Sequence, residues 1–311
     1  MYKLSGIFVL HHMDTADIQA YLDAIERDAT LREERHFEQR AETLDFLGFH
    51  VEMPGSLVAR AENIRLELEA IDRRLFRKLR AAIREGGCRG AAFGALIRQY
   101  VTVARNDRND HNDWGQPEET DYDNLDMLIN GLFSEQGMPE QTRDLEPEMV
   151  LYQKTPARVI FELVENGHLT QEDVFFDLGA GLGQVVVLVH LLAGIPATGV
   201  EFEPAFCAYA QDCARDLQLS DVTFIRGDAR MLDYSGGTVF FLYTPFSGEI
   251  LQDVLGRLRQ AALVRDIKVV TYGPCTPTVA QQSWLYRLNA GADDLYRLAV
   301  FSSREAPKEQ P

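Results

Sequence analysis

The chain has 311 residues, a length that predicts about two domains, because a single domain usually holds about 100–200 residues. Hydrophobic residues make up 46% and charged residues 25% of the chain, proportions that are typical of globular proteins and exclude wholesale disorder and collagen-like repeats. The net charge of −17 argues against nucleic acid or an anionic membrane as a partner, because proteins that bind them concentrate positive charge.

The four cysteines show no C-x-x-C spacing and no neighbouring group of histidines, so we expect neither a disulfide framework nor a metal site. The first residues lack the small-residue cleavage site of a secretory signal. The longest apolar run, residues 185–195, is interrupted by His190 and is shorter than the roughly 20 residues that a membrane helix requires. The sequence therefore predicts a soluble, cytoplasmic protein.

Residues 1–145 are expected to form a mainly helical domain. Apolar residues recur at helical spacing from Asp17 to Ile25, with Thr15 as the N-cap, and again from Leu57 to Ile83. The second of these segments also carries six basic residues, namely Arg73, Arg74, Arg77, Lys78, Arg80 and Arg84. They could form an anion- or RNA-binding face, but we favour a solvated helix face that pairs with nearby acids. The polar, acidic residues 106–124 predict a long loop, and a short helix is expected over 125–133.

Residues 146–305 alternate between strand-like and helix-like segments, which predicts an α/β domain with a doubly wound, mostly parallel, Rossmann-like sheet. The expected strands are 174–178, 198–202, 222–226, 238–243 and 267–272, and the expected helices are 184–193, 205–217 and 249–263. Two further apolar runs, 285–288 and 295–301, predict an antiparallel hairpin that completes the sheet. Residues 306–311 are expected to be a polar tail.

The first expected strand of this domain runs into a glycine-rich turn, Asp177-Leu178-Gly179-Ala180-Gly181-Leu182-Gly183, that opens a helix. Glycines allow positive φ and a close approach of a ligand to the backbone, and the start of a helix offers free N–H groups. The G-x-G-x-G spacing differs from the G-x-G-x-x-G of dinucleotide sites, and Asp177 would repel a pyrophosphate. The turn therefore favours a nucleotide-like ligand with an ammonium group over the dinucleotide of an oxidoreductase.

This turn resembles the first motif of the class I S-adenosylmethionine-dependent methyltransferases, an acid followed by x-G-x-G-x-G. The resemblance implies S-adenosyl-L-methionine as the cofactor, with the three glycines against its methionine part. Glu201 and Asp228 follow the next two expected strands. In those places Glu201 could accept both ribose hydroxyls and Asp228 the adenine amino group, while the backbone at Ala229 serves the adenine ring.

Residues 150–275 resemble, more narrowly, the Dot-type histone lysine methyltransferases. The resemblance rests on the stretch from Asp173 to Val187 and on the loop Leu151-Tyr152-Gln153-Lys154-Thr155 before it. It implies that Tyr152, Thr155 and Gln184 help to bind the cofactor. Lys154 departs from the family pattern, which has an acid there.

The fourth expected strand of this domain ends in Tyr243-Thr244-Pro245-Phe246, where the Dot-type family has Asn-Asn-Phe. Enzymes that methylate the amino groups of bases or glutamine usually carry Asn/Asp-Pro-Pro-aromatic at this point, so such acceptors are disfavoured. Tyr243 and Phe246 are the candidate substrate-side residues, because their rings could wall an apolar, electron-rich channel for an amine. The alternative is that they only pack the end of the strand.

The sequence analysis thus predicts an S-adenosylmethionine-dependent methyltransferase that transfers a methyl group in line to an amine, with protein lysine as one candidate acceptor. Alternatives are a small-molecule N- or O-methyltransferase and a catalytically silent protein that keeps the cofactor fold for interactions. The acceptor, protein or small molecule, and the oligomeric state are left open by the sequence.

Overall fold

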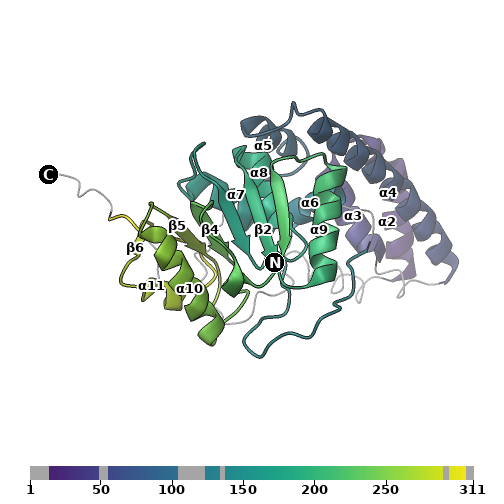
Figure 1. The fold of residues 1–311 in the computed structure, drawn as a ribbon. Coiled ribbons are helices and arrows are strands. Elements are labelled where there is room, and N and C mark those ends of the chain that lie inside the picture. Colours follow the sequence, from purple (N-terminus) through teal and green to yellow (C-terminus); the bar gives the residue numbers. More distant parts are fainter. Residues whose placement is uncertain (1–13, 49–54, 104–122, 134–136, 290–293, 306–311) are drawn as a thin grey trace. The chain divides into compact units, whose positions relative to one another are not determined.

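The computed structural model describes residues 14–48, 55–103, 123–133, 137–289 and 294–305 (Figure 1). Its contacts divide the chain into two compact units, which we call the helical unit (Met1–Gly87 and Gly94–Glu135) and the α/β unit (Cys88–Phe93 and Gln136–Pro311). The polar tail and nearly all of the acidic loop lie outside the described residues. The domain limits given by the sequence analysis stay predictions.

The helical unit contains α2 (Thr15–Arg27), η1 (Ala29–Arg32), α3 (Phe37–Gly48), α4 (Gly55–Arg84) and α6 (Asn124–Leu132), while α5 (Ala91–Ile97) spans the limit between the two units. Thr15 is not the N-cap of α2, as predicted, but its first residue. The cap is Asp14, whose carboxylate accepts hydrogen bonds from the N–H groups of Ala16 and Asp17 at 2.8 and 2.9 Å. Asp17 closes the capping box by accepting from the Asp14 N–H, which a threonine cap one residue later could not arrange.

The core of the helical unit is formed by the apolar residues that recur at helical spacing, including Leu22, Ile64 and Leu68. A fully buried arginine, Arg40, lies beside them. Its Nε donates to the Asp72 carboxylate at 2.7 Å, and its Nη1 donates to the backbone oxygens of Leu31 and Glu33. The buried cation is therefore compensated by an acid and by backbone acceptors.

Three members of the basic cluster on α4 have partners inside the helical unit. Arg73 pairs with Glu69 at 3.4 Å, and Lys78 pairs with Glu34 at 2.7 Å. Arg80 donates to the carbonyl oxygen of Phe133. The interpretation of this cluster as a solvated helix face that pairs with nearby acids is confirmed for Arg73 and Lys78, whereas Arg80 donates to a backbone oxygen.

The α/β unit is built on a seven-stranded sheet with the order β3-β2-β1-β4-β5-β7-β6. The strands are β1 (Phe175–Leu178), β2 (Ala197–Glu201), β3 (Val222–Arg226), β4 (Val239–Leu242), β5 (Lys268–Thr271), β6 (Tyr286–Arg287) and β7 (Ala299–Ser302). The first five pair in parallel, and β7 pairs antiparallel with both β5 and β6. The predicted fold class and the predicted C-terminal hairpin are confirmed.

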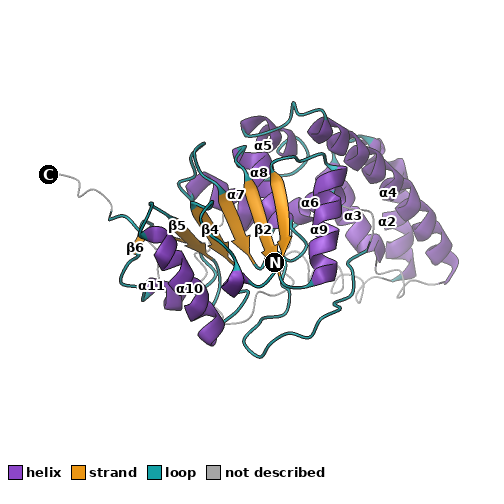
Figure 2. Cartoon of the chain, viewed as in Figure 1, coloured by secondary structure: helices purple, strands orange, loops and turns teal. Residues whose placement is uncertain are grey.

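The helices of this unit cover both faces of the sheet (Figure 2). They are α7 (Ala157–Asn166), α8 (Gln184–Ala193), α9 (Pro204–Asp216), η4 (Ala229–Met231), α10 (Gly248–Ala262) and α11 (Thr276–Ala280). The strands between them are buried on both sides, and Phe175, Phe240 and Phe241 have no exposed surface. Among the residues that the structure describes, no helix is both long enough and apolar enough to cross a membrane.

The order of the strands decides where a ligand can bind. β1 is flanked by β2 and β4, so the connections that leave β1 and β4 run in opposite directions along the sheet. Open parallel sheets bind ligands at such a switch point, in the crevice beyond the carboxyl ends of the strands. The glycine-rich turn follows β1 directly and lies at this point.

Candidate functional site

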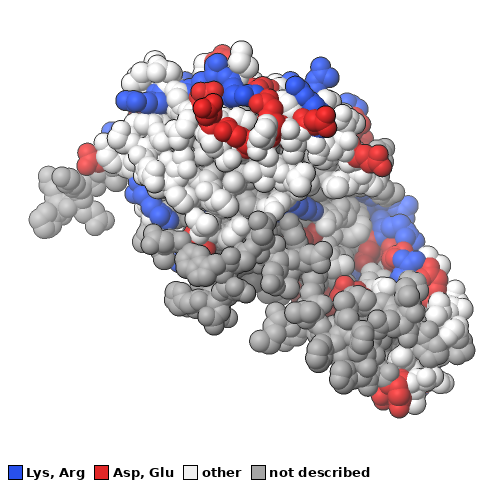
Figure 3. Space-filling view, turned by 90° about the horizontal axis from the view of Figure 1, so that it is seen from below, with Lys and Arg blue, Asp and Glu red and all other residues white. Residues whose placement is uncertain are grey.

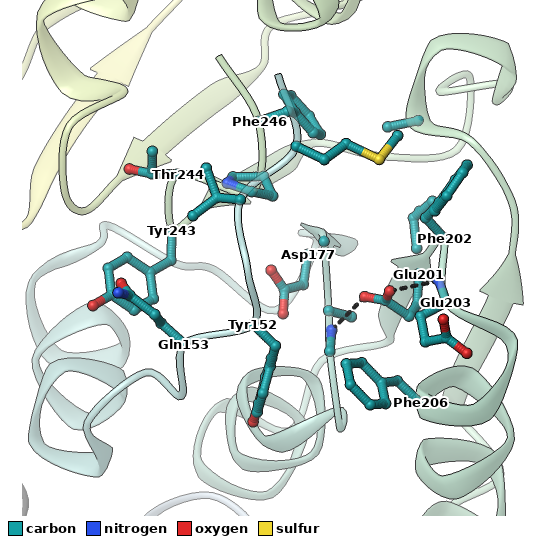
Figure 4. Close-up of a pocket in the computed structure, with 18 of the residues that line it drawn as sticks. Tyr152, Gln153, Asp177, Glu201, Phe202, Glu203, Phe206, Tyr243, Thr244 and Phe246 are labelled. Atoms are coloured by element: carbon teal, nitrogen blue, oxygen red, sulfur yellow. Dashed lines mark hydrogen bonds between the residues drawn. The ribbon is translucent and has the colours of Figure 1, made fainter. Parts of the chain in front are cut away.

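A pocket opens at the carboxyl ends of β1, β2 and β4 (Figure 4). It encloses about 1040 Å³, a volume that includes the open space at its mouth. The structure brings nearly all of the predicted site residues to its walls: Tyr152, Thr155, Asp177, Gly179, Gly181, Gln184, Glu201, Asp228, Ala229, Tyr243 and Phe246. Gly183 is the predicted residue that does not line it.

The glycine-rich turn has the conformation for which its glycines are needed. Gly179, Gly181 and Gly183 have φ of +91°, +51° and +83°, in the left-handed region. A Cβ atom on Gly181 would lie 2.2 Å from the Tyr152 ring, and one on Gly179 would lie 2.2 Å from the Pro245 Cβ. The turn is therefore closely covered by the loops that hold Tyr152 and Pro245, which are joined to each other by a hydrogen bond from the Val150 N–H to the Pro245 carbonyl oxygen.

Gly183 differs from the other two glycines in its role, because it is the N-cap of α8. A Cβ atom there would meet the Phe224 ring at 2.6 Å and the Ala210 side chain at 2.8 Å. This glycine allows α8 to pack closely against the neighbouring strand and helix.

Asp177, at the end of β1, is 3% exposed. Its carboxylate lies in the middle of the residues drawn in Figure 4, and no hydrogen bond or ion pair joins it to any residue that the structure describes. Burial, together with the negative charge of Glu201, raises the pKa of Asp177 well above its ordinary value. A buried carboxylate without a partner is costly, so this site is prepared for a cationic group of a ligand.

Glu201, at the end of β2, is held by two backbone donors. Its Oε2 accepts from the Gly181 N–H at 2.6 Å, and its Oε1 accepts from the Glu203 N–H at 2.8 Å. Burial raises the pKa of Glu201, although these hydrogen bonds oppose the effect. Because each carboxylate oxygen has a further lone pair, a fixed Glu201 can accept two more hydrogen bonds side by side.

Asp228 follows β3 and accepts hydrogen bonds from the Arg230 side chain on both carboxylate oxygens, at 2.6 to 3.0 Å. These bonds hold the pKa of Asp228 below its ordinary value. Next to it, the Ala229 N–H donates to no residue that the structure describes. An ionised acceptor and a free backbone donor therefore stand side by side at this edge of the pocket.

Residues 141–155 provide the wall that faces the strand ends. Tyr152 packs against Gly181 and also meets the Phe206 ring at a centroid distance of 5.5 Å. The Gln184 side chain donates to the Thr155 carbonyl oxygen at 3.1 Å. Gln184 thus ties this loop to the start of α8 and fixes the position of Tyr152.

At the end of β4, Tyr243 lies beside Tyr272, with ring centroids 5.0 Å apart, and Phe246 is 6% exposed. Thr244 between them has φ of +41°, which is unusual for a threonine. Its Oγ1 accepts from the Cys275 N–H at 3.1 Å, which helps to hold this conformation. The two predicted substrate-side residues line the pocket, and their roles stay predictions.

The pocket wall carries charges of one sign. Among the described residues that line it, four are acids, Asp177, Glu201, Glu203 and Asp228, and none is Lys, Arg or His. The sequence analysis missed Glu203 and Phe206, although Glu203 lies just before the α9 proline, where an N-cap is expected. Such a wall favours a cationic ligand and disfavours a diphosphate.

Among the described residues, no group of three or more His, Cys, Asp or Glu side chains could hold a metal ion.

Comparison with known protein families gives a match in the part of the chain that forms much of this pocket. The model of the family "Histone methylation protein DOT1" matches residues 148–224, which include the Tyr152 loop, the glycine-rich turn and Glu201. The resemblance to class I methyltransferases with a local Dot-like segment is thereby confirmed. No curated protein sequence matches the chain.

Three of the solved structures to which part of the chain is similar are methyltransferases. An RNA methyltransferase from Salinibacter ruber in complex with S-adenosyl-L-homocysteine is 24% identical, with a TM-score of 0.38, over 50% of this chain and 98% of that one. The precorrin-6y C5,15-methyltransferase of Geobacter metallireducens is 15% identical, with a TM-score of 0.37, over 51% and 94%. Magnesium protoporphyrin IX methyltransferase from Synechocystis, with bound SAM, is 16% identical, with a TM-score of 0.34, over 47% and 76%.

Proposed function

We propose that this protein is an S-adenosylmethionine-dependent methyltransferase that acts on an amine. The observation that carries the proposal is the buried carboxylate of Asp177 at a glycine-rich turn, which has no hydrogen-bond or ion-pair partner in the described part of the chain. The charged residues described at the pocket wall are all acids. S-adenosylmethionine has an ammonium group and a sulfonium, and it has no phosphate. The charge and the hydrogen-bonding groups of the pocket fit this molecule.

The ammonium group, the ribose and the base of the cofactor each have a counterpart in the pocket. Asp177 would pair with its ammonium group, and Glu201 would accept both ribose hydroxyls. Asp228 would accept the adenine amino group while the Ala229 N–H donates to the neighbouring ring nitrogen. When bound, the cofactor would supply a methyl group on a positively charged sulfur.

The acceptor side is formed by Tyr243 and Phe246. Methyl transfer needs a lone pair on the acceptor that is aligned with the bond to sulfur, and holding the two groups in line supplies much of the rate. An amine must therefore be neutral when it reacts, and an apolar wall favours its neutral form by desolvation. The acids of the pocket attract an amine in its protonated form but repel carboxylates and phenolates, which supports N- over O-methylation.

The finer parts of this proposal concern partners and location. A protein lysine is the acceptor that the Dot-like segment favours, and a small amine is the alternative. Nucleic acid is not expected as a partner, because the chain has a net charge of −17. On the one face drawn in Figure 3, the described basic side chains lie among acidic ones. The four free, buried cysteines support a cytoplasmic location.

The test has two steps. Calorimetry should show binding of S-adenosylhomocysteine and no binding of NAD. Methyl-labelled cofactor should then label lysine-containing peptides or small amines, and carboxylic acids and phenols should stay unlabelled. Binding of NAD alone would refute the proposal, and cofactor binding without transfer to any acceptor in a cell extract would favour the catalytically silent alternative.

A further inference from the structure

Asp228 lies between the pocket and a second hollow on the surface. It lines both, and the outer hollow is completed by Arg230, Met231, Asp253 and Arg257. Arg230 does not line the inner pocket. Its guanidinium therefore reaches Asp228 from the side that a cofactor would not occupy.

Arg230 bridges two acids that are far apart in the sequence. Its Nη2 donates to the Asp228 carboxylate at 2.6 Å and to the Glu146 carboxylate at 2.7 Å. The Arg230 backbone N–H also donates to Asp228, at 2.8 Å. The Arg230 and Asp228 side chains are only 25% and 23% exposed, so this bridge is partly shielded from solvent.

Glu146 belongs to residues 141–150, which form part of the pocket wall through Gln141, Leu145 and Met149. Elsewhere this segment is held by the Glu203 carboxylate, which accepts from the Thr142 hydroxyl at 2.5 Å and the Arg143 N–H at 2.8 Å. Toward its end, the Glu148 carboxylate accepts from the Ile250 N–H in the first turn of α10.

Arg143 adds a contact that bears on the cofactor. Its guanidinium lies 3.6 Å from the centroid of the Phe202 ring, and Phe202 lines the pocket directly after Glu201. Residues 141–150 thus support the part of the pocket that would hold the ribose and the base.

We infer that Arg230 is a positioning residue that selects a 6-aminopurine cofactor: it orients Asp228 toward the base and, through Glu146, holds residues 141–150 over the same end of the pocket. This inference rests on the proposed function. The Arg230 guanidinium group would thus contribute both to recognition of the base and to retention of the ligand.

The selectivity follows from hydrogen-bond chemistry. An ionised carboxylate only accepts hydrogen bonds, so Asp228 requires a donor such as the 6-amino group of adenine. In hypoxanthine, an oxygen replaces that group and the neighbouring ring nitrogen becomes an N–H donor, which would face the Ala229 N–H. Without Arg230 the carboxylate loses its fixed orientation and its ion pair, so the discrimination between the two bases should decrease.

The experiment measures the affinity and dissociation rate of S-adenosylhomocysteine and of its 6-oxo analogue, S-inosylhomocysteine. Wild-type protein should bind the adenine ligand at least about tenfold more tightly. Arg230→Gln should weaken that binding by about tenfold to a hundredfold, the usual effect of losing hydrogen bonds to a charged group, and should reduce the discrimination to the part that the Ala229 N–H maintains. Glu146→Ala should speed dissociation of both ligands and keep the discrimination, because Asp228 and Arg230 remain paired.

Two controls separate this role from a purely structural one. Arg257→Gln changes the same charge in the same outer hollow, and Arg257 makes no hydrogen bond or ion pair to a described residue, so affinity and discrimination should be unchanged. The double variant Glu146→Ala/Arg230→Gln should bind no more weakly than Arg230→Gln alone, since the bridge is already broken. If Arg230→Gln leaves the discrimination unchanged, as it would if both ligands lost affinity equally, the inference is overturned but the proposed function is not. Failure of the wild-type protein to bind S-adenosylhomocysteine would overturn the proposed function and the inference with it.

Discussion

Asp177→Asn provides the sharpest test, because it should change stability and ligand binding in opposite directions. The pKa of Asp177 is raised by burial and by Glu201, so the folded chain binds a proton at this site more tightly than the unfolded chain. The stability that comes from this group is fully present below its unfolded pKa of about 3.9 and is lost as the pH rises through the folded pKa. Asparagine does not ionise, so the ligand-free variant should melt at a higher temperature than the wild type at pH 7.

Cofactor binding should respond in the other direction. Removing one partner of a buried ion pair costs about 3–5 kcal/mol, which corresponds to a loss of affinity of roughly 150- to 5,000-fold for S-adenosylhomocysteine. Calorimetric titration measures the affinity, and differential scanning calorimetry from pH 4 to pH 8 measures the stability. The gain in melting temperature should shrink toward pH 4, where the wild-type aspartate is protonated in the folded chain and increasingly also in the unfolded chain.

The matched control is Asp173→Asn, four residues earlier. Asp173 is also buried, at 7% exposed, but it accepts hydrogen bonds from Lys268 Nζ at 2.8 Å, the Thr170 N–H at 2.7 Å and the Thr238 hydroxyl at 2.8 Å. Its substitution should lower the melting temperature and leave the affinity of the folded protein unchanged. The reasoning is refuted if Asp177→Asn is destabilised as Asp173→Asn is, or if it binds S-adenosylhomocysteine as tightly as the wild type.

Three further predictions concern the glycine-rich turn, pH and the helical unit. Gly181→Ala should lower cofactor affinity by at least about tenfold in calorimetric titrations, because its φ of +51° and a contact of 2.2 Å leave no room for a Cβ atom. The control is Gly236→Ala, where an added Cβ atom would meet no atom within 4 Å, and this variant should bind the cofactor as the wild type does. Cofactor affinity should fall as the pH is lowered from 8 to 5, because burial raises the pKa of Glu201 and its protonated form no longer accepts both ribose hydroxyls; a flat profile in titration calorimetry would contradict this. Arg40→Leu should destabilise the helical unit by about 3–5 kcal/mol in urea unfolding, because it leaves the buried Asp72 carboxylate unpaired. A loss of stability below about 1 kcal/mol, the usual size for a surface ion pair, would show that this charge is not buried in solution.

Much of the fold could be predicted from local patterns. The five parallel strands lie within one or two residues of their predicted positions, and the predicted helix 184–193 coincides with α8. These segments are short apolar runs or helical repeats, and their period is a property of neighbouring residues alone. The prediction of Thr15 as an N-cap was wrong by one residue, because two acids in a capping box at Asp14 and Asp17 outweigh a single hydroxyl.

The candidate site could be predicted only in part. Asp177 and the three glycines follow one another in the chain, so their motif is visible in the sequence. Phe206 and Glu203 were missed, since they reach the pocket from the first turn of α9, and nothing in their local sequence indicates what lies opposite. Gln184, expected to bind the cofactor, donates to the Thr155 carbonyl oxygen, a contact that depends on a loop 29 residues away.

The sequence by itself determined the type of each element, the parallel sheet and the acid-and-glycine turn, because these depend on the alternation and spacing of adjacent residues. Only the tertiary structure decided that the Asp177 carboxylate has no partner among the residues described, and that Arg230 joins Asp228 to Glu146. Both facts are relations between atoms that the chain brings together from up to 84 positions apart. Whether a buried charge is satisfied depends on everything that surrounds it in space, and the order of residues along the chain does not contain that information in readable form.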